Sequence, residues 1–129
     1  MTLADTSAWV EFLRGTGSEV NDRLRALLER DELAATDAVL MEVLAGARDE
    51  AHARRLRRLL GRCEFLATSG PGDYEQAATL YRACRRGGET VRALTDCLIA
   101  AVAIRAEVPV LHADSDFEAL ARHAPLELA

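Results

Sequence analysis

Short apolar segments alternate with longer amphipathic segments along the chain, and this order is the strongest constraint on its fold. The predicted strands are residues 2–4, 33–36, 64–67 and 108–113, with residues 126–128 as a candidate edge strand. The predicted helices are residues 8–13, 20–28, 38–47, 50–62, 73–86, 94–106 and 117–122. Strands separated by helices form a parallel sheet with helices on both faces. The sequence therefore predicts an α/β fold, a three-layer α/β/α sandwich with a small, mainly parallel sheet.

Local signals place the ends of several of these elements. The segment Gly15–Gly17 ends the first helix, and Ser18 is predicted to cap the second. Asp37 is predicted to cap the third helix, which is apolar on nearly all sides and looks almost wholly buried. Residues 69–72, Ser-Gly-Pro-Gly, are predicted to form a loop.

Length and composition indicate one domain over residues 1–129. Half of the residues are hydrophobic, which is enough for a core. The longest apolar stretch, Cys97–Ile104, is far shorter than the ~20 residues that span a bilayer, and the sequence begins with no basic and apolar leader. We expect a soluble, cytoplasmic protein whose three cysteines are reduced thiols.

The charges exclude several functional classes. A net charge of −5 argues against a protein that coats nucleic acid, although it permits a nuclease whose acids gather around divalent cations. All 16 basic residues are arginine. Phosphoacceptor receivers and aspartate-based phosphatases rely on a lysine, and a P-loop needs the GxxxxGK[ST] motif, so these classes are disfavoured.

Four carboxylates lie at positions that a role in solubility does not explain. Glu42 and Asp96 interrupt apolar helices, while Asp5 and Asp114 directly follow predicted strands. Asp5 and Asp114 could each cap a helix or form a turn, and Asp96 could cap its helix or pair with an arginine. Glu42 is the hardest of the four to explain in this way. A buried carboxylate is costly unless it has an ion pair, a raised pKa or a metal ion.

These acids can converge on one pocket, because parallel strands end at the same edge of a sheet and ligands bind there. Four clustered carboxylates repel one another unless cations are present. Hard oxygen ligands of this kind suit Mg²⁺ or Mn²⁺ and do not suit zinc. The sequence therefore predicts a divalent-cation site at the carboxyl ends of the strands.

Four segments in order carry a family resemblance: Asp5-Thr6-Ser7-Ala8-Trp9; Glu42 with the following 44–48 segment; Asp96–Ala101; and Val110–Phe117. Together they resemble the PIN-domain ribonucleases, and their order and spacing most resemble the VapC toxins of type II toxin–antitoxin systems. The resemblance spans nearly the whole chain. It implies the PIN-like α/β/α fold and a metal-dependent endoribonuclease that cleaves tRNA, rRNA or mRNA and so inhibits translation.

The resemblance also implies roles for individual residues. Asp5, Glu42, Asp96 and Asp114 would form the catalytic quartet around one or two Mg²⁺ or Mn²⁺ ions, which would activate a water molecule and stabilise the leaving oxygen. Thr6 or Ser7 would orient a metal-bound water or a ligand. Asp116 would either join the metal site or cap the last helix.

Partner and contact expectations complete this hypothesis. Arg48 and Arg92 are candidates for RNA phosphate contacts, with a solvated surface role as the alternative, and His112 is expected to be a packed residue and not a general base. The resemblance implies a homodimer and a VapB-like antitoxin whose tail enters the acidic cleft. We expect an arginine of that tail to displace or mimic the metal ion while an apolar segment packs beside Trp9, Phe12 and residues 50–62. Trp9 could equally belong to the core. The alternative functions are a housekeeping PIN nuclease in RNA processing and a catalytically silent PIN-like interaction module.

Overall fold

Four short parallel strands form the centre of the molecule, in the order β3-β2-β1-β4. The computed structural model describes residues 1–129, and the strands are β1 (Thr2–Ala4), β2 (Leu33–Ala35), β3 (Glu64–Phe65) and β4 (Val110–Leu111). In the central strand, Leu3 lies in register with Ala34 on one side and with Val110 on the other. Because every pairing is parallel, all four strands end at the same edge of the sheet.

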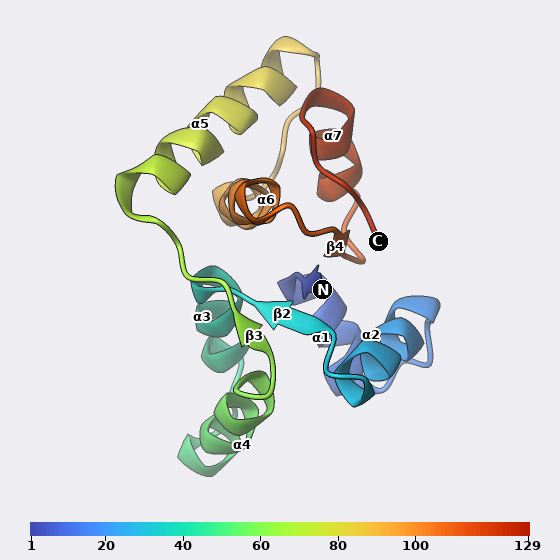
Figure 1. Ribbon diagram of the computed structural model, residues 1–129. Coiled ribbons are helices and arrows are strands. Elements are labelled where there is room, and N and C mark those ends of the chain that lie inside the picture. The colour runs from blue at the N-terminus through green and yellow to red at the C-terminus, as the bar shows by residue number, and fades with distance from the viewer.

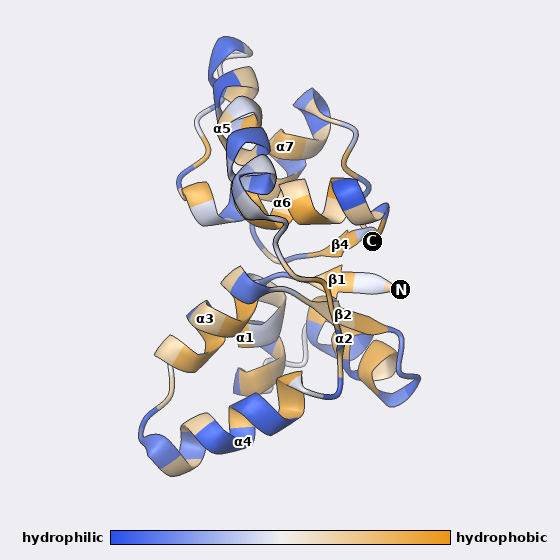
Figure 2. Cartoon of the chain, turned by 60° about the vertical axis from the view of Figure 1, so that its left-hand side comes forward, coloured by the Kyte–Doolittle hydropathy of each residue, from blue (hydrophilic) through white to orange (hydrophobic).

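Seven helices cover the two faces of this sheet. One group comprises α1 (Thr6–Arg14), α2 (Glu19–Glu29), α3 (Asp37–Ala45) and α4 (Glu50–Leu60). The other comprises α5 (Gly70–Arg86), α6 (Leu94–Ala106) and α7 (Asp116–His123). Figures 1 and 2 show the two groups on opposite sides of the strands. The predicted three-layer α/β/α sandwich is confirmed.

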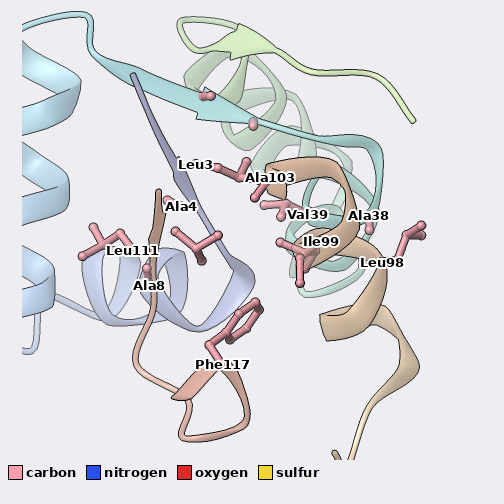
Figure 3. Packing of buried hydrophobic residues seen from close by; sticks show 14 of the residues in the cluster. Leu3, Ala4, Ala8, Ala38, Val39, Leu98, Ile99, Ala103, Leu111 and Phe117 are labelled. Atoms are coloured by element: carbon pink, nitrogen blue, oxygen red, sulfur yellow. The ribbon is translucent and has the colours of Figure 1, made fainter. Parts of the chain in front are cut away.

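The core lies where the central strands meet α6 and α1. Figure 3 shows apolar side chains of β1, β4, α1, α3, α6 and α7 gathered into one cluster. Helix α6 is buried continuously from Asp96 to Ala103, so its backbone cannot shift without disturbing the core. Trp9 is 0% exposed and packs edge-to-face on Phe12 with 5.9 Å between ring centroids. Of the two interpretations of Trp9, the core position is confirmed and the groove position is wrong.

Some local signals act as predicted. The Ser18 hydroxyl accepts a hydrogen bond from the Asn21 amide at 3.1 Å and caps α2. Gly15 ends α1 in the left-handed conformation, with a φ of 62° that favours glycine. Cys63, Cys84 and Cys97 are free thiols, as expected. None of the seven helices has the length and apolar character needed to cross a bilayer.

Other predicted features differ from the structure. Asp37 lies inside α3 and does not cap it; its carboxylate accepts hydrogen bonds from the amide and hydroxyl of Thr68. Helix α3 is not wholly buried, because Met41 is 60% exposed. Residues 70–72 form the first turn of α5 and not a loop, since proline is favoured at the start of a helix.

The strands are shorter than the apolar segments predicted. β3 ends at Phe65 and β4 covers only Val110 and Leu111, while the 126–128 segment contributes a single parallel bridge between Leu128 and Val110. Among the flanking residues, Leu66 and Val108 are half-buried against the core without belonging to a strand. Hydropathy reports burial, so it overestimates strand length here.

Candidate functional site

The four predicted acids come together at the carboxyl edge of the sheet. Asp5, Glu42, Asp96 and Asp114 all line one cleft of about 370 Å³. Asp5 follows β1, and its amide donates a hydrogen bond to the Leu111 carbonyl of β4 at 3.1 Å, which joins the two strand ends. Glu42 projects from α3 and Asp96 from α6. Acids far apart in the sequence are therefore neighbours in space.

Asp5 serves as a helix cap and as a cleft residue at once. Its carboxylate accepts hydrogen bonds from the Ala8 amide at 2.9 Å and from the Ser7 hydroxyl at 2.8 Å. Burial raises the pKa of Asp5, and these two hydrogen bonds partly oppose that rise. The ordinary interpretation of Asp5 as a cap thus holds alongside its place in the cleft.

Thr6 and Ser7 hold carboxylates in position. The Thr6 hydroxyl donates to Oε1 of Glu42 at 2.7 Å, which ties α1 to α3. The Ser7 hydroxyl donates to Asp5 and accepts from the Ala113 amide at 2.8 Å, which ties α1 to the segment after β4. In this structure the partners of both hydroxyls are the acids themselves and the backbone beside them.

Asp96 has the most strongly perturbed carboxyl group of the cleft. Burial raises its pKa to about 7, and the negative charges of the surrounding acids act in the same direction; these are Asp114, Asp5, Asp116 and Glu42. Because Asp96 stands in the buried turn of α6, its carboxyl group cannot move away from the other acids. This group therefore takes up a proton at a higher pH than an ordinary aspartate does.

Asp114 and Asp116 form a second part of the cluster. Ligand oxygens of Asp96, Asp114 and Asp116 all lie within 4.8 Å of one another. Asp116 does not cap α7: it is the first residue of that helix, and its Oδ2 accepts a hydrogen bond from the Arg92 amide at 3.0 Å. Arg92 also forms ion pairs with both carboxylates.

Two residues of the site were not foreseen in these positions. Glu11 lines the same cleft, and the helical period could have revealed it, since Glu11 lies one turn beyond Ser7 on α1. Arg92, for which the sequence left open an RNA phosphate contact or a solvated surface role, pairs with Asp114 and Asp116. Its position four residues before Asp96 was the only signal in the sequence. Arg48, the other predicted RNA contact, lines a neighbouring hollow beside α4.

His112 is a packed residue, as expected. Its ring stacks on Phe117 with 5.5 Å between centroids, and its Nδ1 accepts a hydrogen bond from the Asp114 amide at 3.2 Å. One ring nitrogen is thus occupied by the backbone. His112 is not among the residues that line the cleft.

The donor set fits a divalent cation of the Mg²⁺ or Mn²⁺ type. All of the charged groups in the cleft are carboxylates, which are the hard oxygen ligands that these ions prefer. Asp5, Glu42 and Asp96 form no ion pair with a basic side chain. A bound cation would supply the positive charge that no basic side chain provides in this part of the cleft.

The raised pKa of Asp96 predicts a specific dependence of metal-free stability on pH. An aspartate that is ionised in the unfolded chain above about pH 4 but protonated in the folded protein up to about pH 7 destabilises the fold as pH rises through this window. In EDTA, the free energy of unfolding should fall by about 1–2 kcal/mol between pH 5.5 and 7.5, since one pK unit is worth about 1.4 kcal/mol. Urea titrations at the two pH values measure this change.

Asp96→Asn should remove most of this pH dependence, because the amide is close in shape and does not ionise. Asp22→Asn removes an exposed acid of α2 and should leave the pH dependence of stability unchanged. The explanation fails if Asp96→Asn and the wild type lose the same stability over this pH range.

Comparisons with known proteins agree with this arrangement. The sequence profile of the PIN domain matches residues 2–123. Over its full length the chain is 44% identical to VapC ribonuclease Mb1587 of Mycobacterium bovis and to ribonuclease VapC11 of Mycobacterium tuberculosis, covering 98% of each.

Solved structures share the same fold. VapBC2 of Rickettsia felis, crystallised with a promoter DNA fragment, superposes with a TM-score of 0.75 at 18% identity, over 99% of this chain and 96% of that one. A toxin–antitoxin complex from Klebsiella pneumoniae superposes with a TM-score of 0.73 at 22% identity, over 91% and 90%. Sequence, fold and acidic cleft lead to one assignment. The chain belongs to the PIN domain family and, within it, to the VapC ribonucleases.

Proposed function

We propose that this chain is the toxin of a VapBC-type pair, an endoribonuclease that uses Mg²⁺ or Mn²⁺ to cleave tRNA, rRNA or mRNA in the cytoplasm and thereby inhibits translation. The observation that carries the proposal is that Asp5 and Asp114, which follow β1 and β4, converge on one cleft with Glu42 of α3 and Asp96 of α6. Carboxylates gathered in this way are unfavourable without a cation. The 44% identity to VapC ribonucleases over the whole chain supports the reaction class.

In this proposal the four carboxylates hold the cation, with Asp116 as a further ligand beside Asp96 and Asp114. When bound, the cation supplies Lewis acidity toward the phosphate and lowers the pKa of water at the cleft. Ser7 and Thr6 keep Asp5 and Glu42 aimed into the cleft, so that they need not reorganise when substrate enters. Hydrolysis of this kind needs no side-chain nucleophile.

Arg48 is the proposed contact for RNA phosphates on the substrate side of the cleft. It lines a hollow of about 340 Å³ that shares Thr6, Val10 and Glu42 with the acidic cleft. The two hollows are therefore adjacent. A phosphate next to the cleaved bond would reach this guanidinium, while the cleaved phosphate lies among the carboxylates.

The two alternative functions are less well supported. A housekeeping nuclease of RNA processing would share the cleft, but the curated relatives that match the whole chain are VapC ribonucleases. A silent interaction module has no need of four acids in one cleft, two of which have pKa values raised by burial.

A VapB-like antitoxin is the proposed protein partner, with its tail in the hollow beside α4. Four apolar side chains line this hollow, namely Val10, Leu13, Val43 and Leu56, beside the acid Glu42 and the basic side chains Arg14, Arg48 and His52. An apolar tail segment fits the first four, and a tail arginine could reach the carboxylates in place of the cation. Because Trp9 is wholly buried, the apolar contact must rest on these residues and not on the indole.

We propose that a second copy of the chain packs over an apolar groove on another surface of the molecule. Met41, Tyr74 and Leu94 are 57–64% exposed and line one groove of about 380 Å³ between α3, α5 and α6. An apolar surface of this kind favours a permanent partner. In a symmetric dimer the same groove of each copy would be covered at once.

The first prediction tests the cleft itself. Asp5→Asn, Glu42→Gln, Asp96→Asn and Asp114→Asn should each lower RNA cleavage by about a hundredfold or more, because each removes a charge on which cation binding depends. EDTA should abolish cleavage, and Mg²⁺ or Mn²⁺ should restore it and raise the melting temperature. Gel assays on a panel of structured RNAs, with melting curves in parallel, measure these effects.

Asp22→Asn is the matched control, since it removes a carboxylate far from the cleft and should keep wild-type activity. The proposal is wrong if the wild type cleaves RNA fully in EDTA or if Asp96→Asn retains full activity.

The dimer prediction concerns the apolar groove. Light scattering should give the wild type a mass of about 28 kDa, twice the 14.1 kDa of one chain. Tyr74→Glu places a charge in the groove and should give the mass of one chain. Phe65→Glu, at a residue that is 50% exposed outside the groove, should remain dimeric. A monomeric wild type would contradict the proposed second copy.

The antitoxin prediction uses an antitoxin encoded beside this gene. Leu13→Glu introduces a charge into the proposed tail hollow without touching a carboxylate of the cleft, and should weaken antitoxin binding while RNA cleavage persists; Phe65→Glu is the control. Changing the tail arginine to glutamate should restore ribonuclease activity to the complex, with a larger loss of binding at low salt than at high salt. Unchanged inhibition after that reversal would contradict charge mimicry.

A further inference from the structure

Arg92 crosses from the 87–93 loop between α5 and α6 to the acidic cluster. Its Nη2 donates to Oδ1 of Asp114 at 2.7 Å, and its Nε lies 3.4 Å from Oδ2 of Asp116. The side chain is 71% exposed, whereas those of Asp114 and Asp116 are 27% and 9% exposed. The guanidinium therefore lies over the outer side of the cluster, with one face in solvent.

The loop that carries Arg92 is held independently of its guanidinium. The Arg92 amide donates to Oδ2 of Asp116 at 3.0 Å, a bond that every substitution except proline would keep. Earlier in the loop, Glu89 pairs with Arg122 and with His123 of α7. A change of the Arg92 side chain should thus remove a charge without releasing the loop.

This contact divides the acidic cluster into two halves. Asp114 and Asp116 share one guanidinium, while Asp5, Glu42 and Asp96 form no ion pair. Asp96, Asp114 and Asp116 nevertheless have ligand oxygens within 4.8 Å of one another, so one cation could bind all three. Arg92 already occupies an oxygen of two of these three residues.

We propose that Arg92 is an internal counter-cation that competes with the divalent ion for Asp114 and Asp116, and so sets the metal concentration at which the site fills. This inference rests on the proposed metal requirement. An ion that binds Asp96, Asp114 and Asp116 must draw on two carboxylates that Arg92 already pairs with, and it must bind beside a positive charge. Both effects oppose its entry.

Metal affinity tests the proposal without reference to catalysis. Isothermal titration of EDTA-treated, dialysed protein with Mn²⁺ at low ionic strength should give Arg92→Gln about three- to fivefold tighter binding than the wild type, a size that suits one solvent-exposed charge contact. Arg92→Lys keeps the charge but loses the planar fork and should fall between the two. The gain should shrink at high salt.

Arg86→Gln is the matched control, because Arg86 is an exposed residue at the end of α5 that forms no ion pair. It changes the net charge by the same amount and should bind Mn²⁺ like the wild type. Equal gains in Arg86→Gln and Arg92→Gln would overturn the proposal, since bulk charge would then explain the effect.

Melting temperatures separate competition from a merely structural role. In EDTA, Arg92→Gln should melt below the wild type, because Asp114 and Asp116 lose their counter-charge, and saturating Mn²⁺ should narrow that gap. A gap of equal size with and without Mn²⁺ would overturn the proposal. If the wild type binds no Mn²⁺ at all, the metal site itself is wrong; if the wild type binds and Arg92→Gln binds equally, only the role of Arg92 is wrong.

Discussion

Electrostatic repulsion among five carboxylates is the interaction on which the rest of this site depends. Burial alone raises the pKa of Asp5, and burial together with four neighbouring acids raises the pKa of Asp96 to about 7. The fold must hold these groups together against their charge. It does so with backbone and hydroxyl donors at Asp5 and Glu42 and with one guanidinium at Asp114 and Asp116. Negative charge remains uncompensated in the centre of the cleft, so a divalent cation binds there more favourably than water.

The core supplies the rigidity that this arrangement needs. The buried Trp9 fixes α1 in the core, and the continuously buried part of α6 fixes the position of Asp96. The adjacent ends of β1 and β4 then bring Asp5 close to the segment that carries Asp114. Each acid lies in or next to an element whose position is set by apolar packing, so relaxation of the cleft would cost core contacts. Apolar packing in the core thus maintains a cluster of carboxylates whose mutual repulsion is unfavourable.

Much of the fold was predictable because the order of strands and helices along the chain and the helical period are local properties of the sequence. The alternation of apolar and amphipathic segments predicted the sandwich, and acids at strand ends predicted the cleft. Helix ends were less predictable: Thr68, distant in sequence, takes the Asp37 carboxylate that was expected to cap α3, and Pro71 belongs to a helix where a loop was expected. Strand lengths were overestimated since burial by a helix and pairing in a ladder leave the same apolar signal.

The sequence by itself determined the order of elements along the chain, the parallel sheet and the identity of four of the five acids that line the cleft. Hydrophobic period and carboxylates in apolar surroundings can be read directly from the sequence. Only the tertiary structure decided the partners of those acids. Arg92 lies 22 and 24 residues from the carboxylates that it contacts, and Thr6 lies 36 residues from Glu42. Hydrogen bonds and ion pairs act over about 3 Å, so they are chosen by which loops and helix faces meet after the core has packed, and no local pattern encodes that choice.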